Sequence, residues 1–212
     1  PKTSSAASDV YKRQAEDGIS LRAPGFCNAN QLFGVNSEQA HRIEVMRGPN
    51  STLYGANALH GVLNIISPDV FDLPDFSLSG ELGGHDYLRT QFVASHKMDE
   101  QGVALYGNLV EDGGYKDDSG FEQQKLNLIH QLTASDYSVK NYLAFTNLNQ
   151  ETAGFVQGFE AYKDAELKPS NPNPEAYRDS QSVRAYSQWK FARGEDSYWP
   201  VSYTHLTLPT RS

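Results

Sequence analysis

The segment Arg42–Ser67, RIEVMRGPNSTLYGANALHGVLNIIS, decides the fold of this chain of 212 residues. Its two short apolar runs, Ile43–Met46 and Val62–Ile66, contain β-branched residues and predict two strands. Between them, Arg47–Gly61 contains residues typical of turns and close backbone approach, namely Gly48, Pro49, Gly55 and Gly61. Ser51–Leu59 is a candidate for a short helical turn within this loop.

After Pro74 the pattern changes to an alternation of apolar and polar residues, which is the period of a β-strand. Six such runs follow one another: Phe76–Leu82, Leu88–Ser95, Val103–Leu109, Lys125–Leu132, Val139–Thr146 and Val183–Phe191. A strand of about ten residues is long enough to cross a bilayer when tilted. The runs therefore predict about six antiparallel strands of a transmembrane β-barrel.

The connections between the runs support this prediction. Tight turns at Asp99–Gly102 and Ala134–Asp136 alternate with longer links at Gly113–Phe121 and Gly154–Ser180. Outer-membrane barrels have short periplasmic turns and long extracellular loops. The link Gly83–Asp86 is brief and departs from the pattern. A soluble antiparallel sandwich also alternates and remains the alternative architecture.

The alternation also assigns the two faces of these strands. The residues expected to face lipid are Leu105, Leu109, Leu126, Leu128, Val139, Leu143, Phe145, Val183, Trp189 and Phe191. The residues expected to face the lumen are Tyr106, Asn108, Lys125, Asn127, Lys140, Arg184, Gln188 and Lys190.

Composition excludes several functions. The formal net charge of −8 argues against a nucleic-acid partner, because phosphates attract Lys and Arg. Cys27 is the only cysteine and the histidines lack ligand spacing, so we expect no metal site and no cofactor. GxSxG, HExxH and a phosphate-binding glycine loop are absent, so we expect no enzyme. The adjacent carboxylates Glu111–Asp112 and Asp117–Asp118 are expected to be solvated, with calcium binding left open.

Both ends read as translated DNA adapter. Ser4–Gln14, SSAASDVYKRQ, and Val201–Thr210, VSYTHLTLPT, are encoded by opposite strands of one DNA sequence that looks like a transposase adapter. We therefore interpret residues 1–14 and 201–212 as adapter-derived tails and expect them to pack against nothing. Alignment of the source reads tests this origin.

Arg42–Ser67 closely resembles the plug signature of TonB-dependent outer-membrane receptors, R-I-E-V-x-R-G-P followed by L-Y-G-x-x-A-x-x-G-V-x-N-I-I. The matching positions include Gly48, Pro49, Leu53, Tyr54, Gly55, Gly61 and Asn64. Asp17-Gly18-Ile19 resembles the D-G-V that ends the preceding plug strand. The resemblance implies part of an α+β plug, at 15–70, followed by partial antiparallel transmembrane β-barrel strands, at 71–200.

The resemblance also implies a function. Receptors of this family take up a scarce solute, such as a siderophore, cobalamin or a saccharide, across the outer membrane of a Gram-negative bacterium. TonB, which binds an N-terminal box missing from this chain, supplies the energy, and outer-membrane lipid surrounds the barrel. The identity of the solute is left open. The alternative is an all-β surface adhesin or binding protein without transport, which would not need the plug signature.

Two sets of residues are candidates for this function. The family implies that Arg42, Glu44 and Arg47 hold the plug against the barrel wall, although such a charged run can also be solvated surface. The loop after Ile19 is a candidate for the plug apex that contacts the solute, through Arg22, Phe26, Asn28, Asn30 and Gln31. An ordinary Asn-rich loop whose Phe packs back onto the plug is the alternative.

Overall fold

The computed structural model describes residues 12–21, 32–54, 58, 60–192, 198–207 and 210–211. Its smaller sheet has four strands in the order β2-β1-β4-β3, with bounds β1 Lys12–Glu16, β2 Ile19–Ser20, β3 Arg42–Arg47 and β4 Gly61–Ile66. β1 runs parallel to β4, whereas β3 is antiparallel to it. The two strands expected from the apolar runs are thus β3 and β4, each a little longer than the run.

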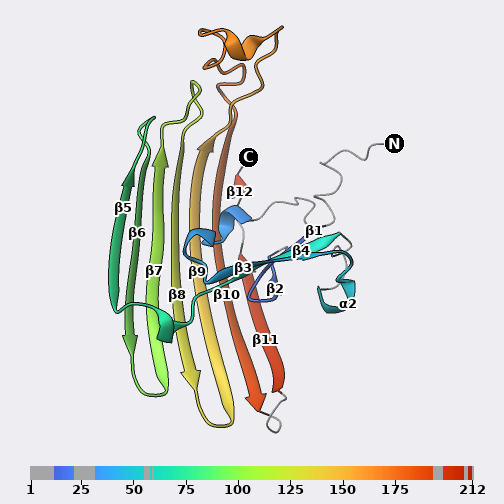
Figure 1. Cartoon of the computed structure of the whole chain (residues 1–212), viewed down its shortest axis with the longest axis vertical. Helices are drawn as coiled ribbons and strands as arrows, with labels where there is room; N and C mark the ends of the chain where they lie inside the picture. The colour runs from blue at the N-terminus through green and yellow to red at the C-terminus, as the bar shows by residue number, and fades with distance from the viewer. Residues whose placement is uncertain are drawn as a thin grey trace.

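The larger sheet contains all six strands expected from the alternation, and we call these six strands the wall. Their bounds are β5 Phe76–Leu82, β6 Leu88–Lys97, β7 Gln101–Asp112, β8 Phe121–Thr133, β9 Tyr137–Glu151 and β10 Tyr177–Ala192. Each pairs antiparallel with the next. The tight turns at 98–100 and 134–136 lie at the lower end, and the links at 113–120 and 152–176 lie at the upper end (Figure 1). The brief link at 83–87 also lies at the upper end and departs from the pattern, as expected. The smaller sheet lies against one face of the wall (Figure 1).

Helical segments are few and short in the described residues. They are α2 Ser51–Tyr54 and four 3-10 turns, η1 Leu32–Gly34, η2 Ser37–Gln39, η3 Val70–Asp72 and η4 Ala161–Lys163. α2 forms the start of the helical turn expected over Ser51–Leu59. None of the helices in the described ranges is long and apolar enough to cross a bilayer.

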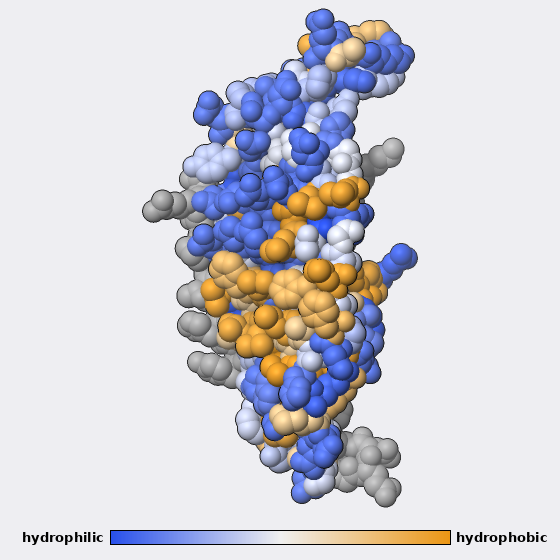
Figure 2. Space-filling view, turned by 90° about the vertical axis from the view of Figure 1, so that its left-hand side faces the viewer, coloured by the Kyte–Doolittle hydropathy of each residue, from blue (hydrophilic) through white to orange (hydrophobic). Residues whose placement is uncertain are grey.

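The wall has the two faces that the alternation predicts. Leu105 and Leu143 are 44% exposed on the outer face, whereas Tyr106 is 1% and Asn127 2% exposed on the inner face. Apolar residues gather in a band at mid-height, with polar residues above and below it (Figure 2). Near the short-turn end, Tyr137 and Trp189 stack with ring centroids 6.2 Å apart. Aromatic side chains in this position suit the boundary between lipid and water.

Val139 is the exception on the outer face. It was expected to be exposed to lipid, but its side chain is only 6% exposed. Its cross-strand partners on the two sides are Leu132 and Trp189, both large, and they flank it. Neighbouring side chains rather than the inner face therefore account for the burial of Val139.

The face assignment predicts opposite chemistry for two neighbouring residues of β9. In the full-length protein with Cys27→Ala, Leu143→Cys should react with a membrane-partitioning maleimide, because Leu143 is 44% exposed on the outer face. Ala144→Cys should stay unreactive, because Ala144 is 3% exposed and faces inward. Equal labelling of both cysteines would refute the register.

The expectation that both tails pack against nothing is wrong for their described parts. Lys12, Arg13 and Gln14 pair with β4. Tyr198–Thr207 forms β11, which pairs with β10 over ten residue pairs, and β12 (Thr210–Arg211) adds two more. An unpaired strand edge is a template for any segment that can be extended. Pro200 is tolerated because β11 is itself the edge strand. The adapter origin of these residues stays a prediction.

Candidate functional site

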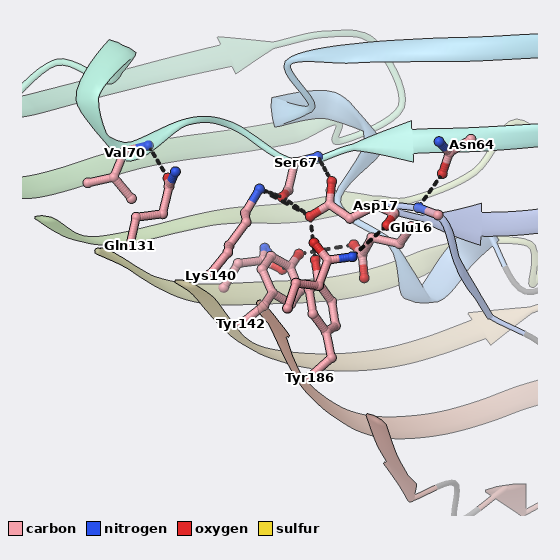
Figure 3. A network of polar contacts seen from close by, with 12 residues as sticks. Glu16, Asp17, Asn64, Ser67, Val70, Gln131, Lys140, Tyr142 and Tyr186 are labelled. Atoms are coloured by element: carbon pink, nitrogen blue, oxygen red, sulfur yellow. Dashed lines mark hydrogen bonds and ion pairs between the residues drawn. The ribbon is translucent and has the colours of Figure 1, made fainter. Parts of the chain in front are cut away.

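The two sheets meet at the tip of the hairpin between β1 and β2. Asp17 and Gly18 form its turn with φ of 48° and 79°. Both residues of a type I′ hairpin turn need positive φ, which explains the Asp-Gly pair. The turn points the Asp17 side chain at the inner face of the wall, where it is 6% exposed (Figure 3).

Three wall residues bind Asp17. The hydroxyl of Tyr186 donates to Oδ2 of Asp17 at 2.6 Å, and Nζ of Lys140 lies 3.1 Å from the same oxygen. Nε2 of Gln188 donates to the backbone oxygen of Asp17 at 2.7 Å. β9 and β10 thus hold the tip of the hairpin through side chains alone.

Residues of β4 and of the following linker hold the hairpin from the other side. Ser67 donates to Asp17 through its backbone N at 2.9 Å and its Oγ at 2.5 Å. Asn64 accepts from the backbone N of Gly18 at 2.9 Å. Because Lys140 Nζ also donates to Ser67 Oγ at 2.5 Å, one wall lysine bridges the hairpin and the linker.

A second carboxylate, Glu16, is buried one residue before the turn. Nη2 of Arg184 lies 3.1 Å from its Oε2, and the two side chains are 8% and 3% exposed. The hydroxyl of Tyr142 donates to Oε1 at 3.0 Å. Burial raises the pKa of Glu16 although Arg184 opposes the shift. The Glu16 carboxyl therefore holds its proton more tightly when the hairpin is docked on the wall than when it is unfolded. Its contribution to the stability of the folded state rises as pH falls toward 4.5.

The position of Tyr142 fixes the orientation of a neighbouring amide. Its single hydroxyl proton is within reach of both Glu16 Oε1, at 3.0 Å, and Asn127 Oδ1, at 2.9 Å. Nδ2 of Asn127 is buried without a hydrogen-bond partner. Turning the Asn127 amide over lets Nδ2 donate to Tyr142, which in turn donates to Glu16. The Tyr142 hydroxyl then donates to Glu16 alone, and the buried Asn127 atom without a partner is Oδ1 instead of Nδ2.

A second contact area lies on the segment that contains η1 and η2. Nζ of Lys125, which is 3% exposed, is 3.1 Å from both carboxylate oxygens of Glu38. Three further wall groups meet this segment: Gln123 donates to the oxygen of Phe33, Thr146 donates to the oxygen of Gly34, and the oxygen of Phe92 accepts from Gln39.

Apolar contact between the sheets is limited by comparison. The wall contributes most of one buried cluster, which includes Tyr106, Ile129 and Tyr142, and Ile19 of β2 packs against it. The contacts of the two polar areas are hydrogen bonds and ion pairs, which water can replace group by group. Such an interface can separate without exposing a large apolar surface.

Comparison with known families identifies the smaller sheet. Residues 11–62 match the model of the family described as TonB-dependent Receptor Plug Domain. This part of the chain is therefore similar to a receptor plug domain. The wall beside it has the fold of the barrel that surrounds such plugs, as solved structures show.

Three solved receptors illustrate the match over both parts. The pyoverdine outer membrane receptor FpvA from Pseudomonas aeruginosa PAO1 matches with TM-score 0.72 and 13% identity, over 93% of this chain and 30% of that chain. The ferric citrate transporter FecA matches with TM-score 0.72 and 14% identity, over 95% and 32%. The siderophore receptor PiuA from Acinetobacter baumannii matches with TM-score 0.69 and 12% identity, over 94% and 28%.

The matches have two consequences. The described part of the chain has the fold seen in these receptors, a plug-like sheet followed by antiparallel barrel strands. It spans only about a third of the length of these receptors. The wall described here is therefore one sector of the barrel that surrounds the plug in its relatives.

The charged residues of β3 do not meet this sector of the wall as the residues of the hairpin do. Arg42 forms an ion pair with Glu44 of its own strand at 2.9 Å, and Asn64 donates to Glu44 at 3.1 Å. The hydrogen bond from Arg42 and, to a smaller extent, that from Asn64 lower the pKa of Glu44. Arg47 is exposed at the end of β3. A contact of Arg42, Glu44 and Arg47 with another part of the barrel stays a prediction.

Glu16, Asp17 and Glu38 are the plug residues that the sequence did not single out as wall contacts. Their wall partners Lys125, Lys140 and Arg184 were expected to face the lumen, and the contacts place them there. A signal for Asp17 was present, because the Asp-Gly turn fixes a hairpin tip. No sequence pattern distinguished Glu16 or Glu38, since a carboxylate on a polar segment is usually solvated.

The remaining candidates divide into two groups. The apex residues Arg22, Phe26, Asn28, Asn30 and Gln31, and also Gly55, lie outside the described residues. Of the plug signature, Gly48 and Gly61 have positive φ of 89° and 152°, and Asn64 is buried. Tyr54 is half-buried beside Leu53 on α2, and Pro49 is exposed.

Metal binding receives no support in the described ranges, where no group of three or more His, Cys, Asp or Glu side chains could hold an ion. This includes the carboxylates at Glu111–Asp112 and Asp117–Asp118.

Proposed function

We propose that this chain is part of a receptor that takes up a scarce solute across the outer membrane, with energy delivered through TonB. The plug family match supports the receptor class. Its structural neighbours carry names that refer to pyoverdine, ferric citrate and ferric catecholate. These names support a siderophore-type iron chelate as the first solute to test, before cobalamin or a saccharide.

The polar docking of the hairpin on the wall is the observation that carries the proposal. A plug that only sealed the barrel would be held best by a continuous apolar interface, because apolar burial is the largest favourable term in association. Here Asp17 and Glu16 dock through ion pairs and hydrogen bonds to Lys140, Tyr186 and Arg184. Such contacts suit a plug that leaves and returns under force.

The proposed partners follow from the class. TonB would act through an N-terminal box, the solute would bind on the extracellular side, and outer-membrane lipid would contact the apolar band of the wall. The apex loop with Arg22, Phe26 and Asn28 is our proposed solute contact, because it combines a cation, an aromatic face and amides.

Uptake of labelled ferric siderophores by iron-limited cells that express the full-length receptor tests the function. We expect uptake that is lost without TonB or after collapse of the proton gradient. Phe26→Ala with Asn28→Ala should reduce uptake at limiting solute. Phe76→Ala is the matched control, because Phe76 is 69% exposed at the start of β5, at the end of the wall where the short turns lie. Uptake that persists without TonB would contradict the proposal, and unchanged uptake by the apex double variant would reject the apex.

A further inference from the structure

A row of polar side chains crosses the outer face of the wall, where the alternation predicts contact with lipid. Three of its members are cross-strand partners, His130 of β8, Asn141 of β9 and Ser187 of β10. Nδ2 of Asn141 lies 3.1 Å from Nδ1 of His130, and Oγ of Ser187 donates to Oδ1 of Asn141 at 2.7 Å. Nε1 of Trp189 donates to Oγ of Ser187 at 2.9 Å. We call these four residues the polar row.

The polar row lies among apolar side chains of the same face. His130 is two positions from Leu128 and two from Leu132, and Asn141 is two positions from Leu143, so each pair points to one face of its strand. Leu128 and Leu143 are 41% and 44% exposed. In a membrane, lipid rather than water would therefore surround the polar row.

The hydrogen bonds of the polar row have a direction. An indole N–H can only donate, so Ser187 accepts from Trp189 and donates its own proton to the oxygen of Asn141. The NH2 group of Asn141 then donates to Nδ1 of His130. A neutral imidazole that accepts at Nδ1 carries its proton on Nε2. Nε2–H of His130 is thus the last donor of the row, and no described residue accepts from it.

The surroundings of this donor indicate which acceptor it meets. An unpaired polar group in hydrocarbon is costly, so the N–H needs an acceptor that lipid can supply. The row ends at Trp189, which stacks on Tyr137 near the short-turn end of the wall. Aromatic belts mark the headgroup level of a bilayer, and the ester carbonyls of phospholipids lie just inside that level. An ester carbonyl accepts hydrogen bonds and is uncharged, which suits a neutral N–H donor.

We propose that Nε2 of His130 binds an ester carbonyl of a phospholipid in the periplasmic leaflet. Asn141 and Ser187 are positioning residues, because their hydrogen bonds keep the His130 proton on Nε2. This inference rests on the proposed placement of the wall in the outer membrane, with short turns on the periplasmic side. It depends neither on the solute nor on TonB.

Native mass spectrometry of the full-length protein tests the lipid site, with diacyl and dialkyl phosphatidylethanolamine offered together. The two lipids share headgroup and chain length, but the dialkyl lipid has no ester carbonyl. The wild type should retain the diacyl lipid about three- to tenfold better, the range for one hydrogen bond. His130→Leu should abolish this preference. His130→Gln should keep it, because an amide offers both an acceptor and a donor.

Val103→Ala is the matched control for the lipid site. Val103 pairs with His130 across β7 and β8 and is 38% exposed on the outer face, but it takes no part in the polar row. The variant should bind both lipids less well and keep the diacyl preference. A wild type that binds both lipids equally would overturn the proposal and point to a polar group of a neighbouring membrane protein instead. A diacyl preference that persists in His130→Leu would also overturn it.

Ser187→Ala tests the positioning role. The substitution removes the hydrogen bond to Asn141 Oδ1, so the Asn141 amide can turn over and the His130 proton can move to Nδ1. The ¹⁵N NMR signals of His130 in bilayers, assigned by their loss in His130→Leu, should show Nε2–H alone in the wild type and both tautomers in Ser187→Ala. An Nδ1–H tautomer in the wild type would overturn the direction of the row. Failure of the uptake test leaves both results interpretable, since neither measurement needs solute or TonB.

Discussion

Replacement of Arg184 by methionine is expected to weaken docking of the plug by about 3–5 kcal/mol, the range for a buried ion pair that loses one partner. Arg184 and Glu16 are 8% and 3% exposed, so solvent screens their interaction little. The remaining carboxylate would keep the hydrogen bond from Tyr142 but would have no cation on its other oxygen. Denaturant-dependent hydrogen exchange of β1 and β4 in the full-length receptor measures the loss.

The double variant Arg184→Met with Glu16→Gln is the control. It removes both charges, and replacement of a whole buried pair is often nearly neutral. We therefore expect it to recover most of the stability that Arg184→Met loses. An Arg184→Met receptor whose plug exchanges like the wild type would show that the pair does not hold the plug.

Substitution of Gly61 by alanine is the second change with a large expected effect. Gly61 has φ of 152°, and a Cβ there would lie 2.5 Å from the backbone oxygen of Met46. Backbone strain of this kind costs on the order of 1–3 kcal/mol, and the contact with Met46 adds to it. Because β4 lies between β1 and β3, the damage should spread to both neighbours. We expect early loss of hydrogen-exchange protection in all three strands.

Gly80→Ala is the matched control for this substitution. Gly80 lies in β5 with nothing within 4 Å of an added Cβ, and its φ is ordinary. A surface change of this kind should alter stability by less than about 0.5 kcal/mol. Equal protection in Gly61→Ala and Gly80→Ala receptors would refute the role of the contact at Met46.

The wall could be predicted from the sequence because one local pattern encodes it. In a strand, successive side chains point to opposite faces, so Leu128 and Asn127 were assigned to opposite faces without knowledge of any neighbour. The structure confirms this pair, with exposures of 41% and 2%. The alternation did not predict the burial of Val139, because its exposure depends on the size of its cross-strand neighbours Leu132 and Trp189.

The pairing of the second tail with the wall could not be foreseen from the sequence in the same way. Tyr198–Thr207 is extended because β10 presents an edge with free backbone groups, a condition created by the fold of other residues.

The sequence by itself therefore determined the strands, their faces and the plug signature, because each depends on residues a few positions apart. Only the tertiary structure decided which plug carboxylates meet which wall cations. Asp17 and Tyr186 are 169 positions apart, and Glu16 and Arg184 are 168 apart. Their contact depends on how the smaller sheet docks on the wall, which no local period encodes. For this reason the sequence analysis predicted wall contacts for the charged residues of Arg42–Arg47, whereas in the structure Asp17 at the hairpin tip contacts the wall.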